Sequence, residues 1–352
     1  MIRIRCSPAS SKRPSNRADW SEDHARRRVR GGAQLQHPCM DLQRRADRGW
    51  QPRLGYEIEA QRKRMTKIVH ESPRPLDHVV LPTADLGIAR ARLTALGFTV
   101  SPQGVHPFGT VNCCVYLGDG TFMEPLAVGD PAAADKAVSE GNVFVARDRA
   151  FRQAHGTEGF SAVVFGTDDA DADHAEFVGA GVSAGPRLDF SRPFIDASGR
   201  ADQASFRLAF AAEPESASAA FFFSCERAKA PKVDRSSLEV HANGARRVLA
   251  VEASTGIAAE AGKLLATIAR SSVKVAPLGE VVVPLANVDL IVKERLGETG
   301  LGLGAMVFGV DDLGAVKSLL VQNGIEHDLT GQRLVIPPAP GQGAAFIFEE
   351  LK

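Results

Sequence analysis

The strongest constraint on the fold is a pattern that occurs three times, a short apolar run followed by an aspartate and a helical stretch that ends at a glycine. It spans 76–100 (LDHVVLPTADLGIARARLTALGFTV), 160–184 (FSAVVFGTDDADADHAEFVGAGVSA) and 303–327 (LGAMVFGVDDLGAVKSLLVQNGIEH). The aspartate and the glycine lie twelve positions apart in every copy, as Asp85 and Gly97, Asp169 and Gly181, and Asp312 and Gly324. A pattern this regular predicts an internal structural repeat.

Each part of the pattern has a physical reason. The β-branched apolar run predicts a strand. The aspartate accepts hydrogen bonds from free amides at a helix N-terminus and suits the helix dipole. Leu86, Ala89 and Leu93 recur at helical spacing and predict one buried face. The glycine supplies the left-handed residue that ends the helix.

A fourth copy is degenerate. Residues 244–275 (GARRVLAVEASTGIAAEAGKLLATIARSSVKV) contain a strand, a break and a helix, but no closing glycine. Strand-forming segments follow all four helices, for example CCVYLGDGTFMEPLAV at 113–128, with a turn at GDG. The chain therefore reads as four βαβββ units, which places it in the α+β class.

Two polar residues on predicted strands carry a resemblance. His78 lies in LDHVVL on a first strand, and Glu124 lies in GTFMEPLA on a fourth strand. Repeated βαβββ units with these residues resemble the vicinal oxygen chelate superfamily of glyoxalases, bleomycin-resistance proteins and dioxygenases, and within it the glyoxalase-like domain proteins. The resemblance implies that modules pair into two curved mixed sheets, one domain at 75–231 and a second, degenerate one at 242–352.

The same resemblance implies a metal site. His78 and Glu124 match its first-strand and fourth-strand ligands for a divalent ion such as Zn, Fe, Mn or Ni. Glu124 would also serve as the catalytic proton carrier. We expect their polar atoms to lie within roughly 4–6 Å of each other across a strand pair. The alternative for His78 is a core histidine with a satisfied hydrogen bond.

The second unit does not repeat these ligands. Alignment of its strands places Ser161 near the His78 position and Ser224 at the Glu124 position. Cys225, Glu226 or His241 would replace them only after a shift of register. The serines are therefore assigned to substrate binding.

Arginines on the second unit's strands are candidates for binding an anionic substrate, namely Arg192 and Arg207. The other histidines of the repeat region, apart from His241, are interpreted as surface or loop residues: His106, His155, His174 and His327. Residues 128–159 are expected to lie outside the sheet and to cap the pocket of the first domain. In the second domain only Glu349 occupies a ligand-like place, so that domain is interpreted as a structural or dimerising copy.

Two functions from different classes follow. One is a glyoxalase-like lyase or isomerase that acts on a small oxygen-rich substrate with a divalent metal in the first domain. The other is a metal-free protein of the same fold that binds or sequesters a small molecule. Retention of His78 and Glu124 favours the first, and the serines of the second unit favour the other. The sequence therefore leaves open whether the chain is an enzyme.

Residues 1–64 differ from the rest. They carry sixteen Lys and Arg against seven Asp and Glu and have no apolar periodicity, which predicts a disordered basic extension. One interpretation is upstream sequence that is not native to the protein, and the other is a basic tail that binds RNA or membranes. The five cysteines form no CxxC pair, and no apolar run reaches the length of a membrane span. We expect a cytoplasmic protein with a small-molecule substrate and without nucleic-acid or membrane partners, and we leave a homodimer open.

Overall fold

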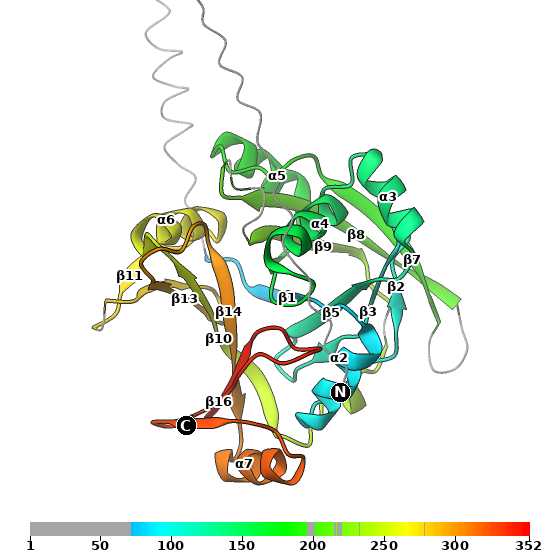
Figure 1. Ribbon diagram of the computed structural model, residues 1–352. Coiled ribbons are helices and arrows are strands. Elements are labelled where there is room, and N and C mark those ends of the chain that lie inside the picture. Colours follow the sequence, from blue (N-terminus) through cyan, green and yellow to red (C-terminus); the bar gives the residue numbers. More distant parts are fainter. Residues whose placement is uncertain (1–71, 196–200, 215, 217–219, 232, 278) are drawn as a thin grey trace, which may run out of the picture. The chain divides into compact units, whose positions relative to one another are not determined.

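The chain folds into two mixed β-sheets with helices on their faces (Figure 1). This computed structural model describes residues 72–195, 201–214, 216, 220–231, 233–277 and 279–352. The predicted extension at 1–64 lies outside the described residues. The sheets and helices confirm the α+β class.

The first sheet contains two units in succession. The first unit comprises β1 (Leu76–Pro82), α2 (Leu86–Ala95), β2 (Gly104–Val105), β3 (Thr110–Asn112), β4 (Val115–Tyr116) and β5 (Phe122–Val128). The second comprises β6 (Ala162–Thr167), α5 (Ala170–Gly179), β7 (Leu188–Ile195), β8 (Ala201–Ala212) and β9 (Phe221–Lys229). Between them lie α3 (Pro131–Ser139) and α4 (Val143–His155), outside the sheet as predicted for 128–159. The hairpin predicted at 113–128 is formed by β4 and β5, and the short strands β2 and β3 precede it.

The second sheet repeats the arrangement after a short helix, η1 (Ser236–Leu238). Its first unit comprises β10 (Ala245–Thr255), α6 (Ala258–Ile268), β11 (Lys274–Val275), β12 (Val281–Pro284) and β13 (Asp289–Glu294). Its second comprises β14 (Gly302–Val310), α7 (Leu313–Gln322), β15 (Asp328–Thr330), β16 (Arg333–Ile336) and β17 (Ala345–Glu350). The four predicted βαβββ modules are therefore present.

Both sheets follow one strand order. The first runs β2-β3-β5-β1-β6-β9-β8-β7 and the second runs β11-β12-β13-β10-β14-β17-β16-β15. Within each unit the first and last strands pair in parallel, and the first strands of the two units pair antiparallel at the centre. The last strand of each unit thus lies directly beside its first strand.

The helix ends explain the sequence pattern. Asp85, Asp169 and Asp312 each accept a hydrogen bond from the backbone N–H three residues later, at the starts of α2, α5 and α7. The closing glycines have positive φ angles of 84°, 71° and 64°. These local contacts confirm the helix boundaries expected from the repeat.

The degenerate helix α6 ends differently. No side chain caps its N-terminus, and Arg270 takes the left-handed position after its C-terminus with φ 53°. An arginine in this conformation is strained because its Cβ crowds the backbone. Its side chain compensates through ion pairs to Glu176 (2.6 Å) and Asp173 (2.9 Å) on α5 of the first sheet.

A buried ion cluster therefore joins the two sheets. Arg74 lies 2.5 Å from Asp173, and their side chains are only 2% and 1% exposed. Arg74 also donates from Nε to the carbonyl of Ile268 at the end of α6. Apolar residues of both sheets complete one continuous core around it, and both sheets belong to one compact unit. The domain boundaries expected at 75–231 and 242–352 stay predictions.

The ion cluster predicts a large mutational effect. Asp173→Asn should lower the free energy of unfolding by about 3 kcal/mol, because Arg74 would remain buried with a weakened partner set. Urea unfolding measures the change. Glu140→Gln is the control, since the pair between Lys136 and Glu140 is 72% and 60% exposed and its loss should cost less than about 0.5 kcal/mol. Equal effects of the two substitutions would contradict the assignment.

The connection between the sheets is held by a buried histidine. Nδ1 of His241 accepts a hydrogen bond from the backbone N–H of Thr99, and Nε2 donates to the carbonyl of Tyr116. These partners require the neutral ring with its proton on Nε2. Burial, with a smaller effect from Arg246, lowers the pKa of His241 below its usual range, although the bond to Tyr116 opposes the shift.

The lowered pKa of His241 predicts a pH dependence. The unfolded chain binds a proton on this ring more readily than the folded chain, so the stability from His241 is present above about pH 6.5 and is lost as pH falls below that value. The melting temperature of the native protein should fall more steeply from pH 7 to pH 5 than that of His241→Gln. Parallel melting curves for both proteins would show that His241 does not titrate in this way.

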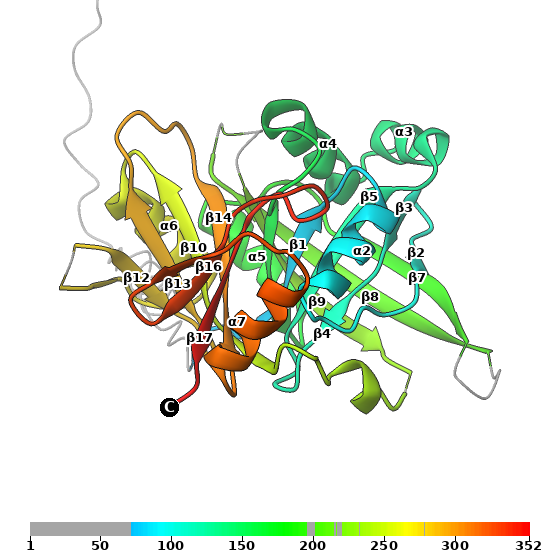
Figure 2. The ribbon, with the colours of Figure 1, turned by 60° about the horizontal axis from the view of Figure 1, so that its bottom comes forward.

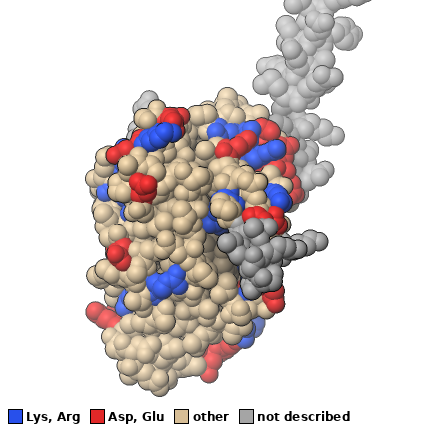
Figure 3. All heavy atoms as spheres, turned by 90° about the vertical axis from the view of Figure 1, so that its right-hand side faces the viewer, with Lys and Arg blue, Asp and Glu red and all other residues tan. Residues whose placement is uncertain are grey.

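None of the described helices is both long and apolar enough to cross a membrane. On the face of the molecule seen in Figure 3, basic and acidic side chains are interspersed. Figure 2 shows α2 and α7 near each other, and the side-chain amide of Asn323 after α7 donates to the carbonyl of Ala95 in α2. The two sheets therefore contact each other through helices as well as through the core.

Candidate functional site

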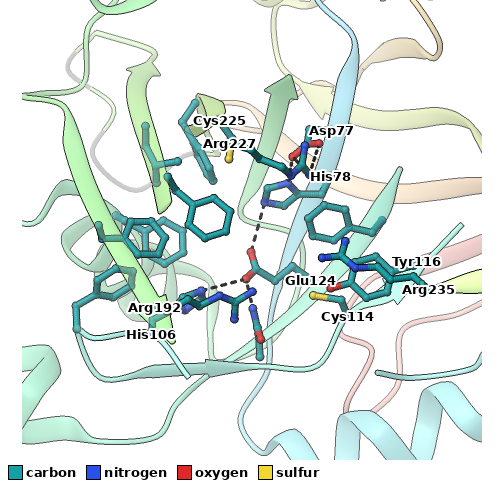
Figure 4. Close-up of a pocket in the computed structure, with 18 residues that line it drawn as sticks. Asp77, His78, His106, Cys114, Tyr116, Glu124, Arg192, Cys225, Arg227 and Arg235 are labelled. Atoms are coloured by element: carbon teal, nitrogen blue, oxygen red, sulfur yellow. Dashed lines mark hydrogen bonds and ion pairs between the residues drawn. The ribbon is translucent and has the colours of Figure 1, made fainter. Parts of the chain in front are cut away.

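The concave face of the first sheet carries a pocket (Figure 4). Six phenylalanines form much of its wall: Phe108, Phe122, Phe144, Phe190, Phe206 and Phe223. Phe144 comes from α4, so the segment between the units contributes to the pocket as expected. The cavity volume is about 80 Å³, room for roughly five to eight water-sized groups.

His78 and Glu124 meet inside this pocket. His78 on β1 pairs with Phe122 on β5, and Glu124 lies two residues further along β5, on the same face. Nε2 of His78 lies 3.4 Å from Oε2 of Glu124, somewhat closer than expected from the sequence. Phe122 stacks on the imidazole with ring centroids 4.3 Å apart. The structure therefore brings the two candidate ligands together, whereas their roles stay predictions.

Each group of this pair favours the charged form of the other. Burial alone would lower the pKa of His78, but contacts with Asp77 and Glu124 outweigh it and raise that pKa. Burial alone would raise the pKa of Glu124, but His78, His106 and Asn112 lower it to about 2. Glu124 is therefore a charged carboxylate, and its contact with His78 favours the protonated imidazole.

Asp77 also lines the pocket, although adjacent strand residues normally face opposite sides. The pairing of β1 with β6 is irregular between Leu76 and His78, and such a bulge re-aims side chains. Oδ2 of Asp77 thereby lies 2.9 Å from Nδ1 of His78, and Arg227 donates to both Asp77 oxygens. Asp77 directly precedes His78 in the sequence, but the regular alternation of side chains along a strand predicts that it faces the other side of the sheet.

His106 is a correction to the sequence interpretation. It was assigned to the surface, but it is buried beside Glu124, with Nε2 3.7 Å from Oε1. Burial lowers the pKa of His106 to about 4, with Arg192 and His78 acting in the same direction, so the ring is neutral. It lies just after β2, and its position depends on how that edge of the sheet folds over the pocket, which strand periodicity does not reveal.

Asn112 was also missed. Its side-chain amide donates to Oε1 of Glu124 at 2.6 Å. It lies on β3, which pairs with β5, so the neighbouring strand supplies this partner. His78, His106 and Asn112 together fix the carboxylate of Glu124.

Ser161 and Ser224 are further corrections. Both are fully buried, neither lines the pocket, and neither hydroxyl has a hydrogen-bond partner among the described residues. The alignment had placed each of them one residue out of register. Because side chains alternate between faces, a shift of one residue moves a side chain to the other side of the sheet. Arg192 lines the pocket, but Arg207 does not. Because side chains alternate along a strand, Arg207 faces the other side of the sheet, where it lies 3.4 Å from Glu226.

The residues of the second unit at the positions of His78 and Glu124 are Ala162 and Phe223, and neither is a metal ligand. The repeat aligns His78 with Ala162, which pairs with Phe221 as His78 pairs with Phe122, and Phe223 lies two residues beyond Phe221 as Glu124 lies two beyond Phe122. Cys225 lines the pocket but occupies neither of these positions. Glu226 does not line the pocket, and His241 is bonded to backbone groups elsewhere.

This donor set bears directly on the expected metal. The resemblance implies ligands from both units of a sheet, and Ala162 supplies none. Among the described residues no three His, Cys, Asp or Glu side chains are placed to hold a metal ion. His78 and Glu124 do not complete a site, and His106, 3.7 Å from Glu124, is not grouped with them as a third ligand, so the described residues do not fit the divalent ion.

The second sheet fills the same place with ion pairs. Glu252 on β10 lies 2.6 Å from Lys293 and 2.8 Å from Arg333, and Arg333 also pairs with Glu349. These charges neutralise one another on the face that corresponds to the pocket. Glu349 is therefore bound to a neighbouring arginine.

Gly104 leaves space for two polar side chains beside the pocket, those of Asn112 and Arg192. A Cβ on Gly104 would overlap Oδ1 of Asn112 and lie 2.5 Å from Nη1 of Arg192. Both atoms belong to the ends of flexible side chains and can move aside. A methyl group here would therefore disturb the site more than the fold.

Gly104→Ala should displace Asn112 from Glu124 and raise the pKa of Glu124 above about 2, while it lowers the free energy of unfolding by only about 1 kcal/mol. A carbon-detected NMR titration of the Glu124 carboxyl measures the shift. Gly118→Ala is the control, because the nearest atom to its added methyl is 3.6 Å away. An unchanged Glu124 titration in Gly104→Ala would refute the role of Gly104.

Comparison with known protein families gives one match. A family model described as "Glyoxalase-like domain" matches residues 76–269, more than half of the chain. A search of curated proteins finds no match. The matched range contains the whole first sheet and therefore the pocket.

Solved structures support the fold. A hypothetical protein from Staphylococcus aureus aligns with a TM-score of 0.57 and 13% identity, over 79% of this chain and 99% of that chain. A mutant of 4-hydroxymandelate synthase from Streptomyces coelicolor aligns with a TM-score of 0.50 and 16% identity, over 79% of this chain and 93% of that chain. At such identities the likeness shows the fold alone, and it agrees with the paired modules expected from the sequence.

Proposed function

The chain belongs to the glyoxalase-like domain family of the vicinal oxygen chelate superfamily, and from this premise we propose that it binds a small molecule in the pocket of the first sheet with its own side chains, without a divalent ion. The observation that carries the proposal is the replacement of donors in the second unit, where Ala162 and Phe223 occupy the positions of His78 and Glu124. A metal-dependent lyase or isomerase is the competing function.

The pocket supports binding in two ways. Its phenylalanine wall offers apolar contact area inside a concave site, the usual setting of a small-molecule site. Its buried polar group, Glu124, is already satisfied by His78 and Asn112, so the apo pocket does not require an ion to compensate a charge. A ligand would be held by packing and by the charged groups at the pocket rim.

Metal content tests this proposal. The purified chain, dialysed against Zn²⁺, Mn²⁺, Fe²⁺ or Ni²⁺ and then freed of excess ion, should retain well below one ion per chain in mass-spectrometric elemental analysis. His78→Ala should retain the same amount, because no site is lost. About one ion per native chain that disappears in both His78→Ala and Glu124→Ala would overturn the proposal in favour of the metal-dependent enzyme.

One contact favours a second function. His78 links the carboxylates of Asp77 and Glu124 through its two ring nitrogens, an arrangement that is able to pass a proton to or from a bound molecule. Such chemistry would make the protein a metal-independent isomerase or lyase. A bound ligand whose C–H proton exchanges in D₂O with the native protein, but not with Glu124→Gln, would support this function.

A further inference from the structure

Two arginines of the pocket have no acidic partner among the residues that the structure describes. Arg192 on β7 lies 5.8 Å from the ring centre of Phe206, and Arg235 in the connection between the sheets lies 4.7 Å from that of Tyr116. Within the described part of the chain, neither guanidinium makes a hydrogen bond or an ion pair. Figure 4 shows them on two sides of Glu124.

The other charges of the pocket are already paired. Arg227 binds both oxygens of Asp77, and Glu124 is in contact with His78 and Asn112. The lining therefore contains three guanidinium groups and two carboxylates. The unpaired positive charge belongs to Arg192 and Arg235.

The neighbouring residues leave a defined space for the side chain of Arg192. Its Nη1 lies where a side chain on Gly104 would be, so the backbone of β2 leaves room for it. Phe206 beneath it stacks on Phe190, with ring centroids 5.0 Å apart, and Phe190 also packs edge-on against Phe108 at 5.1 Å. A cation is thus held at the edge of an aromatic wall.

An unpaired guanidinium beside stacked rings selects a particular ligand chemistry. Guanidinium groups match the planar geometry of a carboxylate and bind it through two parallel hydrogen bonds. Aromatic walls favour flat apolar groups, which bury area in offset or edge-to-face contacts. The cavity volume of about 80 Å³ restricts the buried part of the ligand to a small group.

We infer that the ligand of this pocket is a small aromatic carboxylate, with its carboxylate on Arg192, its ring among Phe190, Phe206 and Phe108, and Arg235 as a second positive charge at the opposite side. This inference rests on the proposed function, because it names the chemical class that the same pocket binds. It adds a charge requirement that the proposed function does not contain.

Benzoate and benzamide are the probes, because they share ring and shape and differ in charge. Ligand-observed NMR titrations with the full chain should give a dissociation constant about tenfold lower for benzoate than for benzamide, or a larger difference still, the range expected for a hydrogen-bonded charged group. Arg192→Gln should remove this preference, and Arg235→Gln should reduce it by a smaller factor.

Arg207→Gln is the matched control. Arg207 lies on β8 of the same hairpin, but it is paired with Glu226 and does not line the pocket. Its substitution should leave the preference for benzoate unchanged. Circular dichroism of all variants checks that the fold is retained, and the comparison of the two probes on the native chain does not depend on any variant.

Three results would overturn the inference. These are equal affinities for benzoate and benzamide, an unchanged preference in Arg192→Gln, and no binding of either probe. Each leaves the proposed function to be decided separately by the metal content. An ion bound through His78 and Glu124 together with a preference for benzoate would instead refute the metal-free function and keep the ligand class.

Discussion

The register in which β1 pairs with β5 determines the site of this protein. The two strands are parallel neighbours, and His78 stands opposite Phe122, so Glu124 points to the same face within reach of the imidazole. Side chains on a strand alternate between faces, and a slip of one residue would turn each of them to the other side. The contact between Glu124 and His78, and the stacking of Phe122 on the imidazole, depend on this choice of face.

The two sheets share one topology, but their corresponding faces carry different side chains. In the first sheet the concave face holds a cavity with a buried His–Glu pair. In the second sheet two carboxylates and two basic groups neutralise one another at the corresponding place, namely Glu252, Glu349, Lys293 and Arg333. The fold is therefore compatible with either a pocket or a closed ion-pair network. What differs is the side-chain set on a few inward positions, which is why fold alone does not define function.

The set of metal ligands expected from the resemblance is incomplete at one position. First-strand and fourth-strand donors of one unit are present and close together, but the counterpart of His78 in the second unit is Ala162. The buried carboxylate of Glu124 is stabilised without an ion, because His78, His106 and Asn112 surround it. Among the described residues, the charged groups of the pocket without an ionic partner are Arg192 and Arg235. Their positive charge favours an anionic ligand.

The sequence by itself determined the elements that depend on local contacts. The aspartates and glycines of the repeat specify helix starts and ends through hydrogen bonds within a few residues, so the four modules and the α+β class could be predicted. His78 and Glu124 were found because each is a polar residue in an apolar strand with a match in a known fold. Even the degenerate unit was recognisable, although its closing residue is Arg270.

Only the tertiary structure decided which side chains share the pocket. Ser161 and Ser224 were assigned to it and face the opposite side, because an alignment error of one residue inverts the face of a strand. Asp77 joins through a bulge, and His106 and Arg235 arrive from segments without a periodic pattern. These positions are set by pairing and packing between segments far apart in the chain, and such long-range contacts leave no local signal in the sequence.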